Sequence, residues 1–173
     1  GQVLQRHHVQ QGNEVCVLTR DVSRRANGVS FINWNARDLG PWTACLEKCD
    51  VLINLCGRSV DCRYNRHNIN EIYASRLDST KVLGQALALL DKKPAVWLNA
   101  SSATIYADSY DKPNDEVEGV IGEGFSVDVC QKWEKAFFEC SVPGIRQVAL
   151  RTSLVLGQHA PFIEIMKKLV RLY

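Results

Sequence analysis

The sequence predicts an α/β protein built on a doubly wound, parallel β-sheet. Short apolar runs rich in β-branched residues alternate with longer segments of helical periodicity, which is typical of strands joined by crossover helices. Two of the apolar runs end abruptly in small polar residues and glycine, as strands do at the ligand-facing edge of such a sheet. The length of 173 residues, of which 46% are hydrophobic and 23% charged, suits one domain with its own core.

The apolar runs predict five strands, at Val15–Thr19, Val29–Ile32, Val51–Asn54, Ala95–Ala100 and Gln147–Arg151. Helical periodicity predicts helices at Val3–Gln11, directly after Pro41, around His67–Leu90, around Val127–Cys140 and from Phe162. Gly12 is placed to end the first helix and Pro41 to begin the second. The acidic, glycine-bearing stretch Ala107–Gly124 is the one long irregular segment, and we expect it to be a lid.

Two strand ends carry the residues that suggest a binding crevice. The run that begins at Trp97 stops at a cluster of small hydroxyl residues, which includes Ser101, Ser102 and Thr104. The run that begins at Val51 leads in the same way through Asn54 to Gly57, where only a hydrogen atom would separate the backbone from a ligand. A serine-rich turn that merely closes a strand is the alternative for one such end, but two ends favour a crevice.

Composition narrows the range of partners. A net charge of +2 with scattered basic residues is too small to indicate a nucleic-acid partner or an acidic membrane surface, so we expect a small-molecule partner. The sequence has no apolar run of about 18 residues and no basic segment followed by an apolar one, so it predicts neither a membrane span nor a signal peptide. A cytoplasmic location is the expectation, and nothing in the sequence argues for a particular oligomer.

The cysteines and histidines do not predict a metal site. Seven cysteines are an odd number, which fits reduced thiols better than a disulfide framework. Cys45 and Cys49 would share one face of a helix, but no second ligand pair at metal spacing accompanies them, and no two histidines have the i, i+4 spacing of helical zinc sites.

The beginning of the sequence is unusual for a doubly wound sheet, because Gly1 leads directly into a helix where a strand and a glycine loop should come first. We therefore expect a partial chain that lacks the first strand. Because that strand is central in the usual order, the strands at Val15–Thr19 and Val51–Asn54 should then have unpaired edges. We also expect that a substrate-binding domain after the final helix is missing.

Several short motifs together resemble the extended short-chain dehydrogenase/reductases, in the atypical nucleoside-diphosphate-sugar epimerase-like branch of the NAD-dependent epimerase/dehydratase family. The resemblance covers nearly all 173 residues, and its specificity lies in the order and spacing of the motifs. They are Thr19-Arg20, Asn54 to Gly57, Ser75-Arg76, Ser101 to Tyr106, Val129-Cys130, Trp133-Glu134 and Arg151 to Gly157. It implies that residues 1–173 form a single, partial NAD(P)-binding domain of the Rossmann type.

The resemblance implies a set of cofactor-binding residues. Gly1 would be the last glycine of the dinucleotide fingerprint, at the helix end where backbone N–H groups attract phosphate. Arg20 stands where an NAD-preferring site would place an acidic residue, so it favours NADP(H) over NAD(H), although the adjacent Asp21 could reverse this preference and a solvated surface charge is the alternative. The full set is Gly1, Arg20, Asn54, Leu55, Cys56, Gly57 and Ser101.

The resemblance also exposes a departure at the catalytic positions. The superfamily uses a tyrosine activated by a lysine four residues later, but here those positions hold Ser126 and Cys130, so the usual proton transfer cannot run on them. Ser102 is implied to donate a hydrogen bond to a substrate oxygen, and Tyr106 is the second candidate catalytic residue, although it can equally be a packed aromatic. Other candidate acids or bases are Tyr110 and Asp128.

These residues leave three functional hypotheses open. The first is an NAD(P)-dependent oxidoreductase or epimerase that acts on a nucleotide-linked or other small carbonyl or alcohol substrate. The second is a non-catalytic dinucleotide-binding sensor or scaffold, which the absent tyrosine–lysine pair favours. The third is an α/β fragment that is active only within the intact protein.

Overall fold

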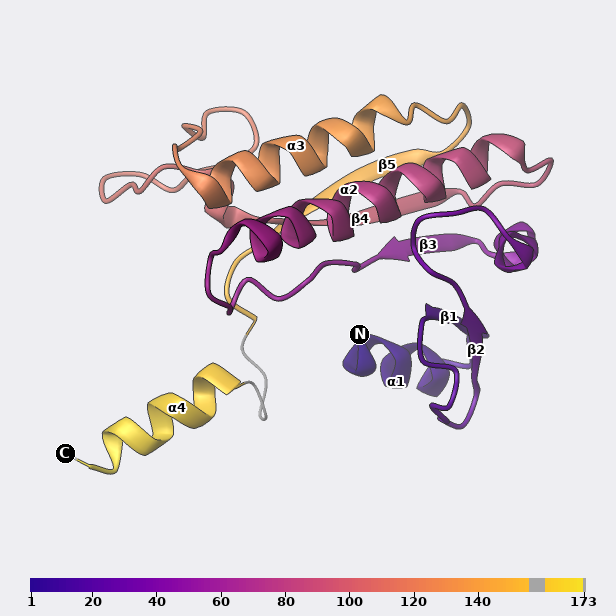
Figure 1. The fold of residues 1–173 in the computed structure, drawn as a ribbon, viewed down its shortest axis with the longest axis horizontal. Coiled ribbons are helices and arrows are strands. Elements are labelled where there is room, and N and C mark those ends of the chain that lie inside the picture. Colours follow the sequence, from indigo (N-terminus) through magenta and orange to yellow (C-terminus); the bar gives the residue numbers. More distant parts are fainter. Residues whose placement is uncertain (156–160, 173) are drawn as a thin grey trace.

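The computed structural model describes residues 1–155 and 161–172, and it contains the predicted alternation of strands and helices (Figure 1). The strands are β1 (Val15–Thr19), β2 (Val29–Asn33), β3 (Val51–Asn54), β4 (Val96–Ser102) and β5 (Arg146–Thr152). The α-helices are α1 (Gln2–Gln10), α2 (Arg66–Leu89), α3 (Phe125–Glu139) and α4 (Pro161–Val170). Two 3-10 segments, η1 (Pro41–Lys48) and η2 (Ala103–Ile105), complete the order. All predicted strands and helices are confirmed, with small shifts at their ends; the helix after Pro41 is a 3-10 helix, and η2 was not predicted.

The strands form two separate parallel sheets. One has the order β1-β2, and the other has the order β3-β4-β5 (Figure 1). No hydrogen-bonded pairing joins β1 to β3 within residues 1–155 and 161–172. In that part of the chain, β1 and β3 each have one edge without a hydrogen-bonded neighbouring strand.

The core lies between the three-stranded sheet and the helices α2 and α3, which run side by side across it (Figure 1). Trp97 of β4 is fully buried and packs edge-on against Phe137 of α3, with ring centroids 4.7 Å apart. Gly84 lets α2 approach the end of α3 closely, because a Cβ atom built there would lie 2.4 Å from the Cys140 sulfur. Trp34, Trp42 and Leu46 extend the core toward η1.

Buried and half-buried side chains alternate strictly along β4, and this alternation decides what the predicted site residues can do. Trp97, Asn99 and Ser101 are buried, whereas Ser102 lies on the other face and is only half-buried. Successive side chains of a strand point to opposite faces of the sheet, so neighbouring serines have different surroundings.

The segment Ala107–Gly124 folds back onto the end of β4 as an irregular loop. Tyr106 and Ile121 form an isolated antiparallel bridge, and the N–H of Ala107 donates to the carbonyl of Val120 at 2.8 Å. The ring of Tyr106 lies so close to Gly119 that a Cβ atom there would be 2.5 Å from it. The loop is thus fastened to the strand end at Tyr106.

None of the helices in the described part of the chain is both long enough and apolar enough to cross a membrane.

Candidate functional site

Two of the predicted strand ends, those of β3 and β4, lie side by side. Parallel pairing places Asn54 beside Asn99, so that β3 ends where β4 continues to Ser102. Arg20 follows β1 directly and is exposed. Burial raises the pKa of the Cys56 thiol, while a hydrogen bond with Ser79 and the charge of Arg20 oppose that rise. Arg20 therefore lies within electrostatic reach of the loop after β3.

Asn54 is buried and fixes the turn that follows β3. Its amide nitrogen donates to Asn99 at 2.7 Å and to the Thr80 hydroxyl at 3.2 Å, while its oxygen accepts from the backbone N–H of Cys56 at 3.0 Å. The Trp133 indole also donates to Thr80, at 3.0 Å. With only 2% of its surface exposed, Asn54 acts through the loop that it shapes.

That loop lies on the first half of α2. The N–H of Arg58 donates to the Ser75 hydroxyl at 2.9 Å, and the Arg76 guanidinium donates to the Arg58 carbonyl at 3.2 Å. A Cβ atom at Gly57 would lie 3.2 Å from the carbon of this guanidinium. Leu55 and Gly57 are exposed, and Cys56 is half-buried.

Arg76 is a site residue that the sequence analysis named only as part of a motif. Its guanidinium stacks over the Trp133 ring at 5.2 Å, and burial lowers its pKa while the neighbouring Cys130 and Tyr64 raise it. Spacing along the helix gives no sign of this contact, because Arg76 meets the loop after β3 only through tertiary packing.

Ser102 is the hydroxyl that the structure leaves available. It accepts from the Thr104 hydroxyl at 3.0 Å and from the Thr104 N–H at 3.3 Å, so its own proton is free to donate outward. The Thr104 hydroxyl lies 3.6 Å from the Cys130 sulfur. Burial raises the pKa of the Cys130 thiol, so this thiol is neutral and can donate toward Thr104.

Ser101, by contrast, belongs to a buried ion-pair network. Its hydroxyl donates to Glu134 at 2.5 Å, and Arg151 binds the same carboxylate through two nitrogens at 2.9 and 2.8 Å. Burial raises the pKa of Glu134, but the hydrogen bonds from Arg151 and Ser101 outweigh burial and hold it below its usual value. The network fastens α3 to the ends of β4 and β5.

Tyr106 is joined to the same network. Arg151 donates to its hydroxyl at 2.6 Å, and the guanidinium lies over its ring at 5.1 Å. The phenol is therefore oriented by a cation, which fits either reading of Tyr106, as a catalytic residue or as a packed aromatic.

The other candidate acids and bases do not belong to the network of Ser101, Glu134 and Arg151. Tyr110 is 96% exposed, and Ser126 is exposed on the first turn of α3. Asp128 accepts hydrogen bonds from Lys132, at 2.7 Å, and from Tyr73. These bonds lower the pKa of Asp128, whereas burial and the bond to Asp128 raise the pKa of Tyr73 to about 12.

Gly1 is the N-cap of α1, and no side chain caps the first turn of that helix. The carboxylate of Asp21 accepts from the backbone N–H and the hydroxyl of Ser23, at 3.0 and 2.5 Å. Asp21 is thus turned toward its own loop.

No group of three or more potential metal ligands comes together within the described ranges 1–155 and 161–172. The Cys49 thiol donates to the carbonyl of Cys45 at 3.1 Å, and all seven cysteines are free.

The chain is a Rossmann-type α/β protein. Its strands are parallel, helices cover the sheet, and small polar residues stand at the strand ends. The chain belongs to the NAD dependent epimerase/dehydratase family, whose model matches residues 1–121. The resemblance given by the sequence motifs is confirmed; Leu156 and Gly157 of the last motif lie outside the described residues.

The curated relatives that the chain matches include proteins named as epimerase family proteins. The mouse epimerase family protein SDR39U1 is 33% identical over 153 residues, which are 86% of this chain and 48% of that protein. The epimerase family protein ML0860 of Mycobacterium leprae is 30% identical over 160 residues, which cover 92% and 51%. The chain spans about half the length of the curated relatives it matches.

Solved structures show the same fold. The human epimerase family protein SDR39U1 (isoform 2), solved with NADPH, superposes with a TM-score of 0.80 at 26% identity, over 99% of this chain and 56% of that one. MoeE5, solved with UDP-glucose and NAD, superposes with a TM-score of 0.75 at 17% identity, over 99% and 56%. The second match supports the fold alone.

Proposed function

We propose that this chain is the cofactor-binding part of an NAD(P)-dependent oxidoreductase or epimerase of the short-chain dehydrogenase type. Its substrate would be a nucleotide sugar or another small carbonyl or alcohol compound. The observation that carries the proposal is the Ser102 hydroxyl, which has a free proton at the end of β4, next to the end of β3. Family membership and the NADPH in the similar human structure support it.

The residues at this edge fit a dinucleotide. The uncapped first turn of α1 offers backbone N–H groups for a pyrophosphate. Gly57 is exposed and has no side chain, so a ligand could approach the backbone of this loop closely. The Arg76 guanidinium lies directly beneath Gly57. The ligand would also contact Gly1, Leu55 and Cys56. Asn54 and Ser101 would hold the surrounding backbone in place through their buried hydrogen bonds. The bound cofactor would supply hydride transfer.

NADP(H) is the cofactor that we favour. Arg20 is exposed, and no carboxylate lies within 4.0 Å of it in the part of the chain that the structure describes. Asp21 is occupied by Ser23, so it is poorly placed to bind a ribose 2′-hydroxyl. A guanidinium without an acidic partner suits a 2′-phosphate.

Ser102 would orient the reacting oxygen of the substrate. Its two bonds from Thr104 fix the oxygen lone pairs, and the donor chain from Cys130 through Thr104 aligns the free proton outward. Tyr106, held by Arg151, would be the phenol available for proton transfer if the loop 107–124 moves.

A second candidate function is a dinucleotide-binding sensor or scaffold without catalysis. The observation that favours it is the pair of residues at the usual tyrosine and lysine positions, Ser126 and Cys130. Cys130 is buried and its thiol is neutral, so it supplies no cation to activate a phenol.

Titration of NADPH and NADH, followed by the fluorescence of the reduced nicotinamide, tests the proposal, with Ser102→Ala compared with the exposed control Ser141→Ala. We expect binding of NADPH that is at least about tenfold tighter than that of NADH. In assays of the whole protein on carbonyl and alcohol substrates, Ser102→Ala should remove turnover while affinity for NADPH stays within about twofold.

Other results would separate the candidates. No turnover on any substrate, with NADPH still bound, would favour the sensor. Equal turnover in wild type and Ser102→Ala would show an enzyme in which Ser102 does not orient the reacting oxygen. If neither dinucleotide binds, both functions are wrong.

A further inference from the structure

Three of the seven cysteines gather in one place, although they come from two different parts of the chain. Cys16 lies on β1, Cys45 lies on η1, and Cys49 directly follows η1. The thiols of Cys16 and Cys45 form a hydrogen bond with one another, and the Cys49 thiol donates to the Cys45 carbonyl at 3.1 Å. Cys16 is exposed, and the other two are half-buried. None of the three is assigned above to the candidate functional site.

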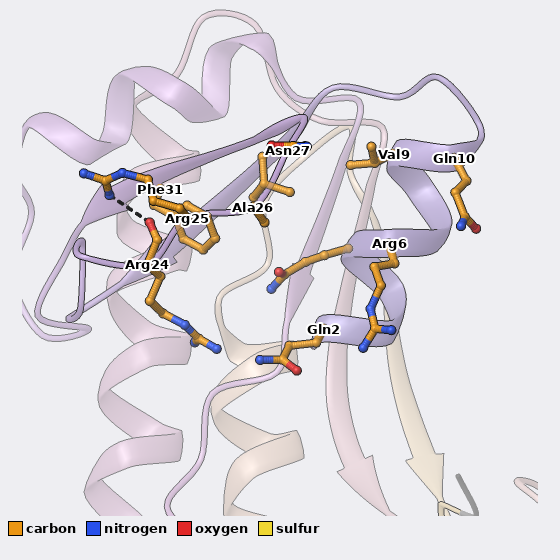
Figure 2. A pocket seen from close by; sticks show the side chains of 11 residues that line it. Gln2, Arg6, Val9, Gln10, Arg24, Arg25, Ala26, Asn27 and Phe31 are labelled. Carbon is orange, nitrogen blue, oxygen red and sulfur yellow. Dashed lines mark hydrogen bonds between the residues drawn. The ribbon is translucent and has the colours of Figure 1, made fainter. Parts of the chain in front are cut away.

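The two-stranded sheet turns Cys16 away from α1. Val9 of α1 lines the same pocket as Val29 and Phe31 of β2, so one face of β2 is turned toward α1 (Figure 2). Cys16 pairs with Ser30, which lies between Val29 and Phe31 along β2. Successive side chains of a strand point to opposite faces of the sheet, and paired residues share a face. Cys16 therefore lies on the face opposite to α1.

The face that carries Cys16 is turned toward the core. Leu18, two residues after Cys16 on β1, packs against the buried cluster that contains Trp42 and Leu46 of η1. Cys45, also on η1, packs against the same cluster. Strand alternation and core packing therefore agree with the hydrogen bond between the two thiols, and they bring Cys16 and Cys45 together from distant positions in the sequence.

The hydrogen bond makes the two thiols unequal. It lowers the pKa of Cys16 by more than burial raises it, because Cys45 donates to the Cys16 thiolate. The pKa of Cys45 is raised by the same hydrogen bond, by burial, and by the charges of Cys16 and Cys49. When one thiol of the pair ionises, the negative charge therefore resides on Cys16, which is the exposed member. Since the thiolate is the form that oxidants attack, Cys16 is the more reactive of the two.

We propose that Cys16 and Cys45 form a reversible disulfide when a peroxide oxidises Cys16. The Cys16 thiolate attacks one peroxide oxygen, the O–O bond breaks, and the other oxygen takes up a proton and leaves as water. This step leaves a sulfenic acid on Cys16. The Cys45 sulfur then attacks the Cys16 sulfur, an S–S bond replaces the S–O bond, and the hydroxyl leaves with the Cys45 proton as water. The two sulfurs together give up two electrons, which reduce one hydrogen peroxide to two waters.

Oxidation of Cys16 also prepares Cys45 for the second step. The hydrogen bond with Cys16 and the negative charge of Cys16 are two of the causes that raise the pKa of Cys45. A sulfenic acid is neutral, so its formation removes this charge and makes the Cys45 thiol easier to deprotonate. The Cys49 thiol is bound to the Cys45 carbonyl, so Cys45, which already contacts Cys16, is the partner.

The disulfide would tie β1 to a part of the core. Among the described residues, β2 is the only strand paired with β1, whereas η1 carries the buried Trp42 and Leu46. A bond between Cys16 and Cys45 closes the intervening chain into a loop, and such a cross-link restricts the unfolded chain. We therefore expect amide hydrogen exchange in β1 to be at least about tenfold slower in the oxidised protein than in the reduced protein.

Mass spectrometry of the whole protein after treatment with hydrogen peroxide under native conditions tests the inference. Free thiols are blocked with an alkylating reagent, and the peptides that a disulfide joins are identified after digestion. The wild type should give a link between Cys16 and Cys45 that dithiothreitol reverses. Cys62→Ser is the matched control, because Cys62 is a half-buried free thiol in the loop before α2, and this variant should keep the link.

Two further variants test the order of the steps. Cys45→Ser should stop at a sulfenic acid on Cys16, which dimedone traps. Cys16→Ser changes an exposed side chain, and it should give no link to Cys45 and no slower exchange in β1 after peroxide. Circular dichroism checks that each variant folds.

The absence of a link between Cys16 and Cys45 in the native protein would overturn the inference. A link that forms only in urea would overturn it as well, because the fold would then not bring the two thiols together. Neither result bears on the proposed function, since neither cysteine is assigned to the cofactor or the substrate.

Discussion

Two neighbouring serines show how strongly a single step along a strand changes the role of a residue. Ser101 points into the helical layer and donates to Glu134, whereas Ser102 points to the other face and keeps a free proton. Both are serines in one motif, so the sequence alone does not distinguish their roles. The pleat of β4 separates a structural residue from a candidate catalytic one.

The ion pair between Glu134 and Arg151 should be a main source of local stability. Glu134 is 7% exposed, and Glu134→Gln would leave Arg151 without its carboxylate. We expect a loss of about 2–3 kcal/mol in the free energy of unfolding, below the range for fully buried pairs because Arg151 keeps some water. Urea denaturation measures this loss.

The matched control for that variant lies on the same helix. Glu139 forms an exposed pair with Lys135 at 3.8 Å, so Glu139→Gln should change the free energy of unfolding by less than about 0.5 kcal/mol. Equal losses in both variants would show that the buried pair has no special contribution.

The same pair predicts the direction of a pH effect. Because the pKa of Glu134 is lowered in the folded protein, its carboxylate contributes full stability above the pKa of the unfolded chain, about 4.3. This contribution is lost as the pH falls through the lower pKa of the folded state. The difference in unfolding free energy between wild type and Glu134→Gln should therefore shrink below about pH 4, as urea denaturation at several pH values would reveal. A difference that grows on acidification contradicts this assignment.

At the scale of elements, the packing of α2 against the end of α3 depends on Gly84. Glycine within a helix normally costs about 1 kcal/mol relative to alanine, so Gly84→Ala would stabilise an isolated helix. Here the added Cβ atom would meet the Cys140 sulfur at 2.4 Å and the Cys140 Cβ at 2.7 Å. Overpacking of this kind costs about 1–3 kcal/mol and should outweigh the gain from helix propensity.

We therefore expect Gly84→Ala to lower the free energy of unfolding by about 1 kcal/mol, as measured by urea denaturation. Gln85→Ala, at the next and exposed position of the same helix, should change it by less than about 0.5 kcal/mol. A stabilised Gly84→Ala variant would mean that α3 moves away at no cost.

At the scale of the whole molecule, the two sheets should differ in local stability. β4 has a hydrogen-bonded neighbour on each side and carries the buried Trp97, whereas among the described residues β1 pairs only with β2. Opening β1 breaks fewer contacts, because the buried core cluster lies chiefly between the three-stranded sheet, α2 and α3. Amide hydrogen exchange should be at least about tenfold slower in β4 than in β1. Equal protection in both strands would show that the sheets unfold as one unit.

The extent of agreement between sequence and structure follows from the range of the interactions involved. Apolar runs of period two and segments of helical period depend on neighbouring residues, so the strands and long helices of the described residues could be predicted. The family could be recognised in the same way, because its motifs are local stretches such as Asn54 to Gly57. The short 3-10 turn after Ser102 was missed, since three residues carry no periodicity.

The sequence by itself determined the order of strands and helices, the polar strand ends and the family. Only the tertiary structure decided that Ser101 binds Glu134, that Arg76 lies beneath Gly57 and that Arg151 binds Tyr106. The physical reason is distance along the chain: these partners stand many residues apart, and helix packing and strand alternation bring their side chains together.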